Sequence, residues 1–258
     1  VVPASLADSI WLARDLGALM DEVETGGADW ARLAGLVPAE LANWWQVTLE
    51  FLEIVTRAWP ALLAERNASN PAAHRSAAIL AEAARLTRNP PSGPVIAAGS
   101  TGSIPATAQL LAAISRLPQG AVVLPGLDRA MDDESWAAIG EEGGQASGFG
   151  HPQAGLKKLI GVLGLTRSDV EELATPSAPV AARMAIITEA LRPAETTDGW
   201  AARQEMPVDS QAFAGVSLVE AGNEREEALA IAVALRAALD EGSTALVTGD
   251  RELARRVS

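Results

Sequence analysis

The sequence predicts an α/β protein in which pieces of a parallel sheet alternate with wholly helical segments. Two short apolar runs, at 94–99 and 120–126, lie on either side of a helical pattern. This strand–helix–strand order is typical of a parallel, right-handed β-α-β unit. A similar order returns at 216–248, and the stretches before and between follow helical spacing. With 258 residues, 48% of them hydrophobic, the chain is long enough to bury a core in one large or two smaller domains.

Residues 1–89 are expected to be entirely helical. Ser5 and Asp8 can cap a first helix, and Pro38 can occupy the first position of a second. Pro60 is expected to kink or end that second helix, while Asn70-Pro71 opens a third that runs to about Thr87. Four tryptophans in this stretch share helical spacing with Leu and Val, which favours a place in the core over base stacking: Trp30, Trp44, Trp45 and Trp59.

The next stretch carries the predicted strands and the turn between the first strand and its helix. Ser103 is the expected N-cap of a helix over 108–117, with Pro105 just inside it. After the second strand, a loop rich in glycine and acidic residues runs to about Gly150, with one short helical piece around Trp136. From His151 the pattern returns to helix.

Three helices are expected after His151, at 154–163, 167–173 and 180–191, followed by a polar, irregular connection at 196–214. The final stretch predicts a strand at 216–221, an amphipathic helix at 224–240, a strand at 243–248 and a helix from about Asp250.

Charge and composition exclude several classes of protein. The chain has 20 basic and 33 acidic residues, a net charge of −13, with no basic stripe, which argues against a primary DNA track. It has no cysteine and only two histidines, which excludes disulfide scaffolds and Cys- or His-rich metal sites. Apolar runs shorter than a membrane span and the lack of a signal-peptide pattern predict a soluble, cytoplasmic chain. Because residue 1 is valine and a helical pattern reaches Ser258, we expect a piece of a longer protein.

The sequence contains two kinds of candidate site, a phosphate-binding turn and groups of acidic residues. Gly99, Ser100, Thr101, Gly102 and Ser103 lie between a strand and a helix, where free backbone amides can bind phosphate. The turn lacks both the lysine of a P-loop and the three spaced glycines of a dinucleotide site, so ordinary turn chemistry is favoured. Asp132-Asp133-Glu134 and Glu141-Glu142 are expected in a solvated loop. The sequence therefore predicts no catalytic residue, no metal and no cofactor.

Three blocks of sequence resemble the AddB family of alphaproteobacteria. They are PVIAAGSTGSIPATAQLLAAISRLPQGAVVLPGLD from Pro94 to Asp128, HPQAGLK from His151 to Lys157, and VSLVEAGNEREEALAIAVALRAALDEGSTALVTGDRELARRV from Val216 to Val257. The resemblance implies two RecA-like domains of superfamily 1 helicase type with helical insertions. Helical insertions would span 1–89 and 151–212, part of the first RecA-like domain 90–150, and the start of the second 213–258.

The resemblance also implies a role and partners. Members of this family process broken DNA ends together with an AddA subunit, so AddA and, through the complex, DNA are the implied partners. Active relatives end the strand equivalent to Val95–Ala98 with an Asp-Glu pair that holds magnesium, and they carry an arginine where this chain has Ala254. Here the strand ends in Ala98-Gly99, so the resemblance implies a scaffold without a motor.

Two other classes of function stay open on the sequence. A small enzyme could use the Ser100–Ser103 turn to bind a phosphorylated substrate. A protein-interaction module would suit the acidic surface and the tryptophan-rich helices.

Overall fold

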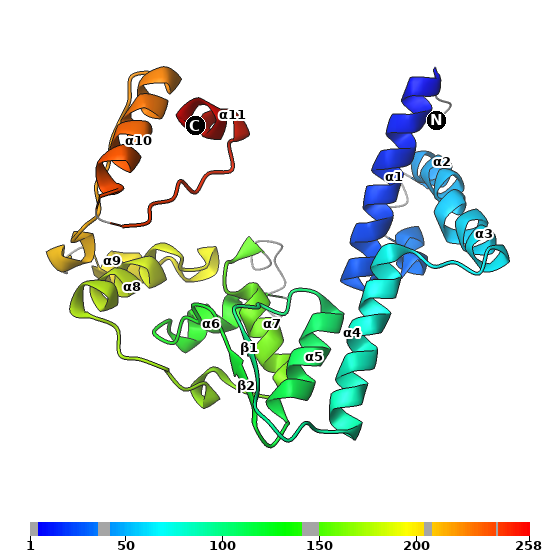
Figure 1. Ribbon diagram of the computed structural model, residues 1–258, viewed down its shortest axis with the longest axis horizontal. Coiled ribbons are helices and arrows are strands. Elements are labelled where there is room, and N and C mark those ends of the chain that lie inside the picture. Colours follow the sequence, from blue (N-terminus) through cyan, green and yellow to red (C-terminus); the bar gives the residue numbers. More distant parts are fainter. Residues whose placement is uncertain (1–4, 36–41, 141–149, 204–207, 241) are drawn as a thin grey trace. The chain divides into compact units, whose positions relative to one another are not determined.

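The computed structural model describes residues 5–35, 42–140, 150–203, 208–240 and 242–258 (Figure 1). The chain divides into two compact units by its contacts. Unit 1 comprises residues 1–175 and 188–206, and unit 2 comprises residues 176–187 and 207–258. Helix is the main secondary structure of the described residues, which include one parallel pair of strands.

Unit 1 begins with helices whose ends were largely predictable. The Ser5 side chain accepts a hydrogen bond from the Asp8 amide, which confirms the predicted cap, and Asn70 with Pro71 begins the last of these helices as expected. Asn70 also joins three helices, because its side chain donates to Glu24 and accepts from the Trp59 indole at 2.7 Å. The elements are α1 (Leu6–Gly26), η1 (Trp30–Gly35), α2 (Ala42–Glu53), α3 (Trp59–Glu65) and α4 (Pro71–Arg88).

Pro60 changes the helix without ending it. A π-helical turn, Ile54–Ala58, follows α2 and leads directly into α3, where Pro60 occupies one of the first two positions. The wider π turn relieves the clash that a proline ring makes with the carbonyl four residues earlier. Pro38, the predicted start of α2, lies outside the described residues.

The predicted tryptophan core is only partly confirmed. Trp30 and Trp45 are half-buried, whereas Trp59 is 38% exposed and directs its indole nitrogen to Asn70. The side chain of Trp44 lies outside the described residues.

The core of unit 1 lies where one face of the sheet meets two helices. Strands β1 (Val95–Ala98) and β2 (Gly120–Val123) are parallel, with Ala97 opposite Val122, and α5 (Pro105–Ser115) connects them. Both residues pack against a buried cluster that includes Leu111 of α5 and Leu159 of α7 (Ala154–Leu163), and Leu159 is fully buried. The predicted β-α-β unit is therefore present at 95–123.

The rest of unit 1 consists of short elements around this core. They are α6 (Asp133–Ala138), the 3-10 turn η6 (Arg167–Asp169), the end of α8 (Ala178–Ala190), the 3-10 turn η7 (Ala194–Thr196) and α9 (Gly199–Arg203). The short helix expected around Trp136 is confirmed as α6. The helix expected at 167–173 is wrong beyond its first turn, because the structure has only η6 there.

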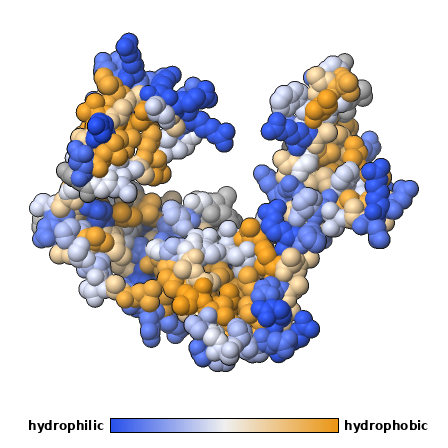
Figure 2. Space-filling view, in the orientation of Figure 1, coloured by the Kyte–Doolittle hydropathy of each residue, from blue (hydrophilic) through white to orange (hydrophobic). Residues whose placement is uncertain are grey.

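Unit 2 contains the first part of α8, the 3-10 turn η8 (Ser210–Phe213), α10 (Glu224–Ala238) and α11 (Arg251–Val257). Asn223 and Asp250 cap α10 and α11 by accepting amide hydrogen bonds. Arg256 of α11 pairs with Glu224 of α10. Figure 2 shows apolar surface over α10, where Leu229 and Val233 are exposed.

The predicted RecA-like fold is wrong. The sheet of the described residues has only two strands. The segments at 216–221 and 243–248, which were expected to be strands, do not form strands. A RecA-like sheet buries both of its faces under helices. Here Ile96, on the face opposite Ala97, is 66% exposed. Leu218 and Val247, in the two other apolar runs, are 86% and 94% exposed, because an apolar run becomes a buried strand only beside a paired neighbour.

No helix in the described ranges is both long and apolar enough to cross a membrane.

Gly102 is expected to be intolerant of a side chain. Its φ is +60°, and a Cβ there would lie 2.7 Å from Leu159 Cδ1, which the core holds in place. We expect Gly102→Ala to lower the free energy of unfolding by about 2–4 kcal/mol, from left-handed strain plus overpacking. Gly99→Ala is the matched control, since its φ is +79° but the space is open, and we expect it to cost only about 1–2 kcal/mol in urea denaturation. Equal losses for the two variants would contradict this account.

Candidate functional site

The carboxyl ends of β1 and β2 are the first place to look for a site. Parallel strands direct their carboxyl ends to one edge of the sheet, and α/β proteins bind ligands there. At this edge lie the turn 99–103, which follows β1, and the connection 124–140, which follows β2. The hydrogen bonds of these two segments determine which polar groups are free to bind a ligand.

Two of the backbone amides in the turn after β1 form hydrogen bonds within the fold. The Gly99 amide donates to Val123 O at 3.2 Å and so extends the strand pairing by one residue. The Gly102 amide donates to Ser100 Oγ at 3.2 Å, so one donor that a phosphate would need is already used. Thr101 and Ser103 are exposed.

Ser103 does not cap α5, and that prediction is wrong. The N-cap is Ile104, whose extended backbone follows from the proline after it, and it makes no side-chain cap. Pro105 begins the helix as expected. The five turn residues thus lie next to one another, and the hydrogen bonds of the Gly99 and Gly102 amides hold the turn.

The connection after β2 is anchored by α7. Gln153, just before α7, donates through Nε2 to Gly126 O at 2.9 Å and accepts at Oε1 from the Asp128 amide at 3.0 Å. Lys157 Nζ donates to three carbonyl oxygens at the end of α6, those of Trp136, Ala137 and Ile139, at 2.9, 3.1 and 2.7 Å. A cation at the carboxyl end of a helix is favourable for both hydrogen bonding and the helix dipole.

Arg167 holds the same connection from η6. Its guanidinium donates to the carbonyl oxygens of Asp128 and Met131, pairs with Asp133 at 2.8 Å, and lies over the Trp136 ring at 4.9 Å. Such stacking adds a cation–π attraction to the hydrogen bonds.

Arg192 holds the connection from the segment after α8. Its Nη1 donates to Ser135 Oγ at 2.7 Å and lies 2.6 Å from Asp132 Oδ2. Ser135 is fully buried, and its hydroxyl also contacts Thr196 Oγ1 at 2.9 Å. Asp132 caps α6 by accepting from the Ser135 amide at 2.8 Å. This amide hydrogen bond is the first cause that lowers the pKa of Asp132 below its usual value, and Arg192 adds to it.

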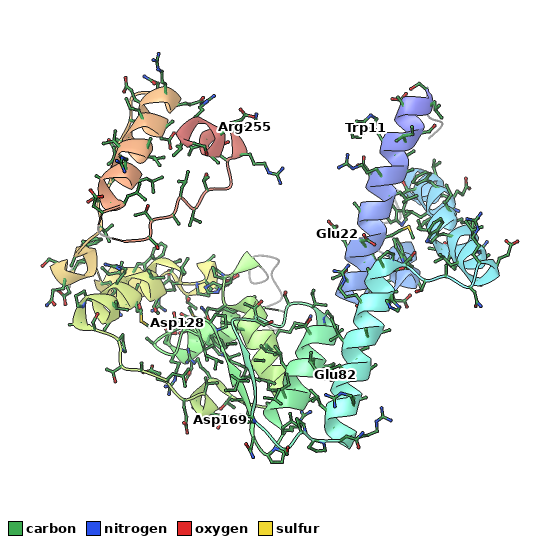
Figure 3. All side chains as sticks on the ribbon, viewed as in Figure 1. Trp11, Glu22, Glu82, Asp128, Asp169 and Arg255 are labelled. Atoms are coloured by element: carbon green, nitrogen blue, oxygen red, sulfur yellow. The ribbon has the colours of Figure 1, made fainter. Side chains whose placement is uncertain are left out.

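Asp128, Asp132 and Ser135, in the connection after β2, form hydrogen bonds within the fold. Asp128 (Figure 3) accepts from the Ala130 and Met131 amides at 2.9 Å each and from Thr188 Oγ1 at 2.7 Å. Within the described ranges, no three His, Asp or Glu side chains gather as metal ligands would. Of the acidic candidates, Asp132 serves as a cap, and Glu141-Glu142 lie outside the described residues.

Sequence reasoning missed the residues that organise this edge. Gln153 and Lys157 belong to the HPQAGLK block, so the resemblance marked them without giving a reason. The contacts of Arg167 and Arg192 at this edge had no local signal, because those partners lie more than 30 residues away in the chain. His151 is structural as well, since its Nδ1 accepts from the Gln153 amide while Nε2–H donates to Leu191 O.

Comparisons with protein-family models, with curated proteins and with solved structures found no match to this chain.

We expect Lys157→Met to destabilise the chain by about 2–3 kcal/mol, because methionine keeps the apolar stem but leaves the carbonyl oxygens at the end of α6 without their charged donor. The neighbouring Lys158→Met is the control, since Lys158 is exposed and should change stability by less than about 0.5 kcal/mol. Urea denaturation of both variants measures the difference, and similar stabilities would argue against the role of Lys157.

The lowered pKa of Asp132 predicts that the stability of the chain depends on pH. A carboxyl group whose pKa is lowered by folding stabilises the native state above its unfolded pKa, and that stability is lost as pH falls from the usual aspartate value of about 4 through the lower folded pKa. Asp132→Asn preserves an N-cap but removes the charge that Arg192 contacts. We therefore expect the wild type to exceed the variant in unfolding free energy at pH 7 and the gap to narrow below about pH 4. A gap that does not vary with pH would refute this.

Proposed function

We propose that this chain is a catalytically inactive scaffold segment of an AddB-like subunit, which supports the processing of broken DNA ends together with an AddA subunit. The proposal rests on the sequence resemblance and on how two of the resembling blocks fold.

The interlocking of two resembling blocks carries the proposal. The first block ends at Asp128, and the second begins at His151. Gln153 of the second block hydrogen-bonds to the backbone of Gly126 and Asp128 at the end of the first. Residues that carry the resemblance thus have a structural role in this fold, which supports the proposed kinship.

The use of polar groups at the strand edge supports a scaffold over an enzyme. A general base or metal ligand needs a lone pair that faces substrate. Asp128 and Asp132 instead direct theirs to backbone amides, to Thr188 and to Arg192, and the Ser135 hydroxyl is buried. Hydrogen bonds of this kind stabilise the connection after β2, which is the role expected of a scaffold.

The charge supports a protein partner over direct contact with DNA. A net charge of −13 repels phosphate, and DNA affinity depends strongly on neutralising lysine and arginine side chains. A scaffold that acts through AddA needs no basic track of its own.

Two binding measurements test the proposal. We expect the tagged 258-residue chain to retain AddA from the same organism in a pull-down, while an unrelated tagged protein of similar negative charge does not. In a fluorescence-anisotropy titration at low salt, we expect no binding of single-stranded DNA up to about 50 µM protein, a concentration at which many non-specific DNA binders are occupied.

Three outcomes would contradict the proposal. Failure to retain AddA would remove the partner, and saturable binding of DNA by the chain alone would replace the scaffold with a DNA-contacting module. A rise in melting temperature with ATP or a sugar phosphate would favour the small-enzyme alternative, because a ligand at 100 times its Kd stabilises by about 2.7 kcal/mol.

A further inference from the structure

The last stretch of unit 1, residues 188–203, is attached to the rest of that unit by polar contacts. We call this stretch the strap. Thr188 Oγ1 donates to Asp128 at 2.7 Å, Arg192 reaches Asp132 and Ser135, and Thr196 contacts Ser135. His151 Nε2 donates to Leu191 O at 2.6 Å.

The strap also has structure of its own, organised around Glu189. Arg192 donates to both carboxylate oxygens of Glu189, at 3.0 and 3.2 Å, and Arg203 donates to one of them at 3.0 Å. The Trp200 indole donates to Glu189 O at 2.9 Å. These contacts tie the two ends of the strap to each other, so it can move as one piece.

Little apolar surface fixes the strap in place. Its buried residues are Thr188, Pro193 and Thr196, while Leu191 and Trp200 are exposed. In the neighbouring core, Leu111, Leu159 and Ile160 are at most 3% exposed. Apolar burial supplies most of the stability of a fold, and segments that lack it open locally at lower free energy than the core.

We propose that the strap opens and closes as one unit while the core of β1, β2, α5 and α7 stays folded, and that Arg192 is the residue that keeps it closed. Arg192 joins the internal centre of the strap, Glu189, to the connection after β2, at Asp132 and Ser135. With a side chain only 14% exposed, this arginine is held in both contacts at once.

The strap lies in the sequence between two segments of unit 2, residues 176–187 and residues 207–258. The contacts that hold it closed are all within unit 1. Its opening therefore breaks contacts of unit 1 alone, and the proposal does not depend on the proposed function.

Hydrogen exchange of the full chain, followed by mass spectrometry, tests the proposal. We expect Arg192→Met to speed exchange in peptides covering the strap at least tenfold, with exchange in α5 and α7 unchanged. Arg85→Met is the matched control, because Arg85 makes a bidentate pair with Glu82 within α4, away from the strap, and it should leave strap exchange unchanged. Thr196→Val, which removes only the hydroxyl contact to Ser135, should give a smaller acceleration in the same peptides.

Two results would overturn the proposal. Equal acceleration of the strap, α5 and α7 in Arg192→Met, or in Thr196→Val should the first variant fail to fold, would mean that unit 1 opens as a whole. Unchanged strap exchange in a folded Arg192→Met chain would mean that Arg192 does not hold the strap closed.

Discussion

Where the chain continues beyond a strand, its backbone carbonyl and amide groups need new hydrogen-bond partners. Much of the structure of unit 1 follows from this requirement. The connection after β2 has only the short helix α6 to satisfy its own backbone. Gln153, Lys157 and Arg167 supply side-chain hydrogen bonds to it from α7 and η6. An unpaired buried carbonyl costs about 1–3 kcal/mol, so the position of α7 and η6 and the shape of the connection depend on each other. One face of the small sheet packs against α5 and α7.

The same requirement uses carboxylate and hydroxyl groups of the connection after β2. At the carboxyl ends of parallel strands, enzymes commonly expose carboxylates and hydroxyls to a ligand. In this chain Asp128 accepts two backbone amides, and Ser135 lies buried between Asp132, Arg192 and Thr196. These contacts hold the connection after β2 to the segment before α7 and to the segment after α8.

Local signals in the sequence predicted local structure well. Ser5, Asn70 and Pro71 begin helices as expected, and the apolar runs beside α5 form the parallel pair. Prediction failed where a partner decides the outcome. The segments 216–221 and 243–248 each contain three or four apolar residues, but no neighbouring strand pairs with them in the described residues. Ser103 failed by one position, since Pro105 fixes where α5 begins. The contacts of Arg167 and Arg192 with the connection after β2 were not predictable, because that connection is distant from both arginines in the sequence.

The contacts of the strap also imply an order of events during synthesis. Gln153 and Lys157 contact partners 18–27 residues earlier in the chain, whereas Arg192, Thr188 and Thr196 contact partners 57, 60 and 61 residues earlier. Longer loops close at greater entropic cost, and a chain folds from its amino end as it leaves the ribosome. The β-α-β core and α7 can therefore assemble before Arg192 has been made. Interactions that form this late govern the rate of unfolding more than the rate of folding, so the strap influences how long the native state lasts once it has formed.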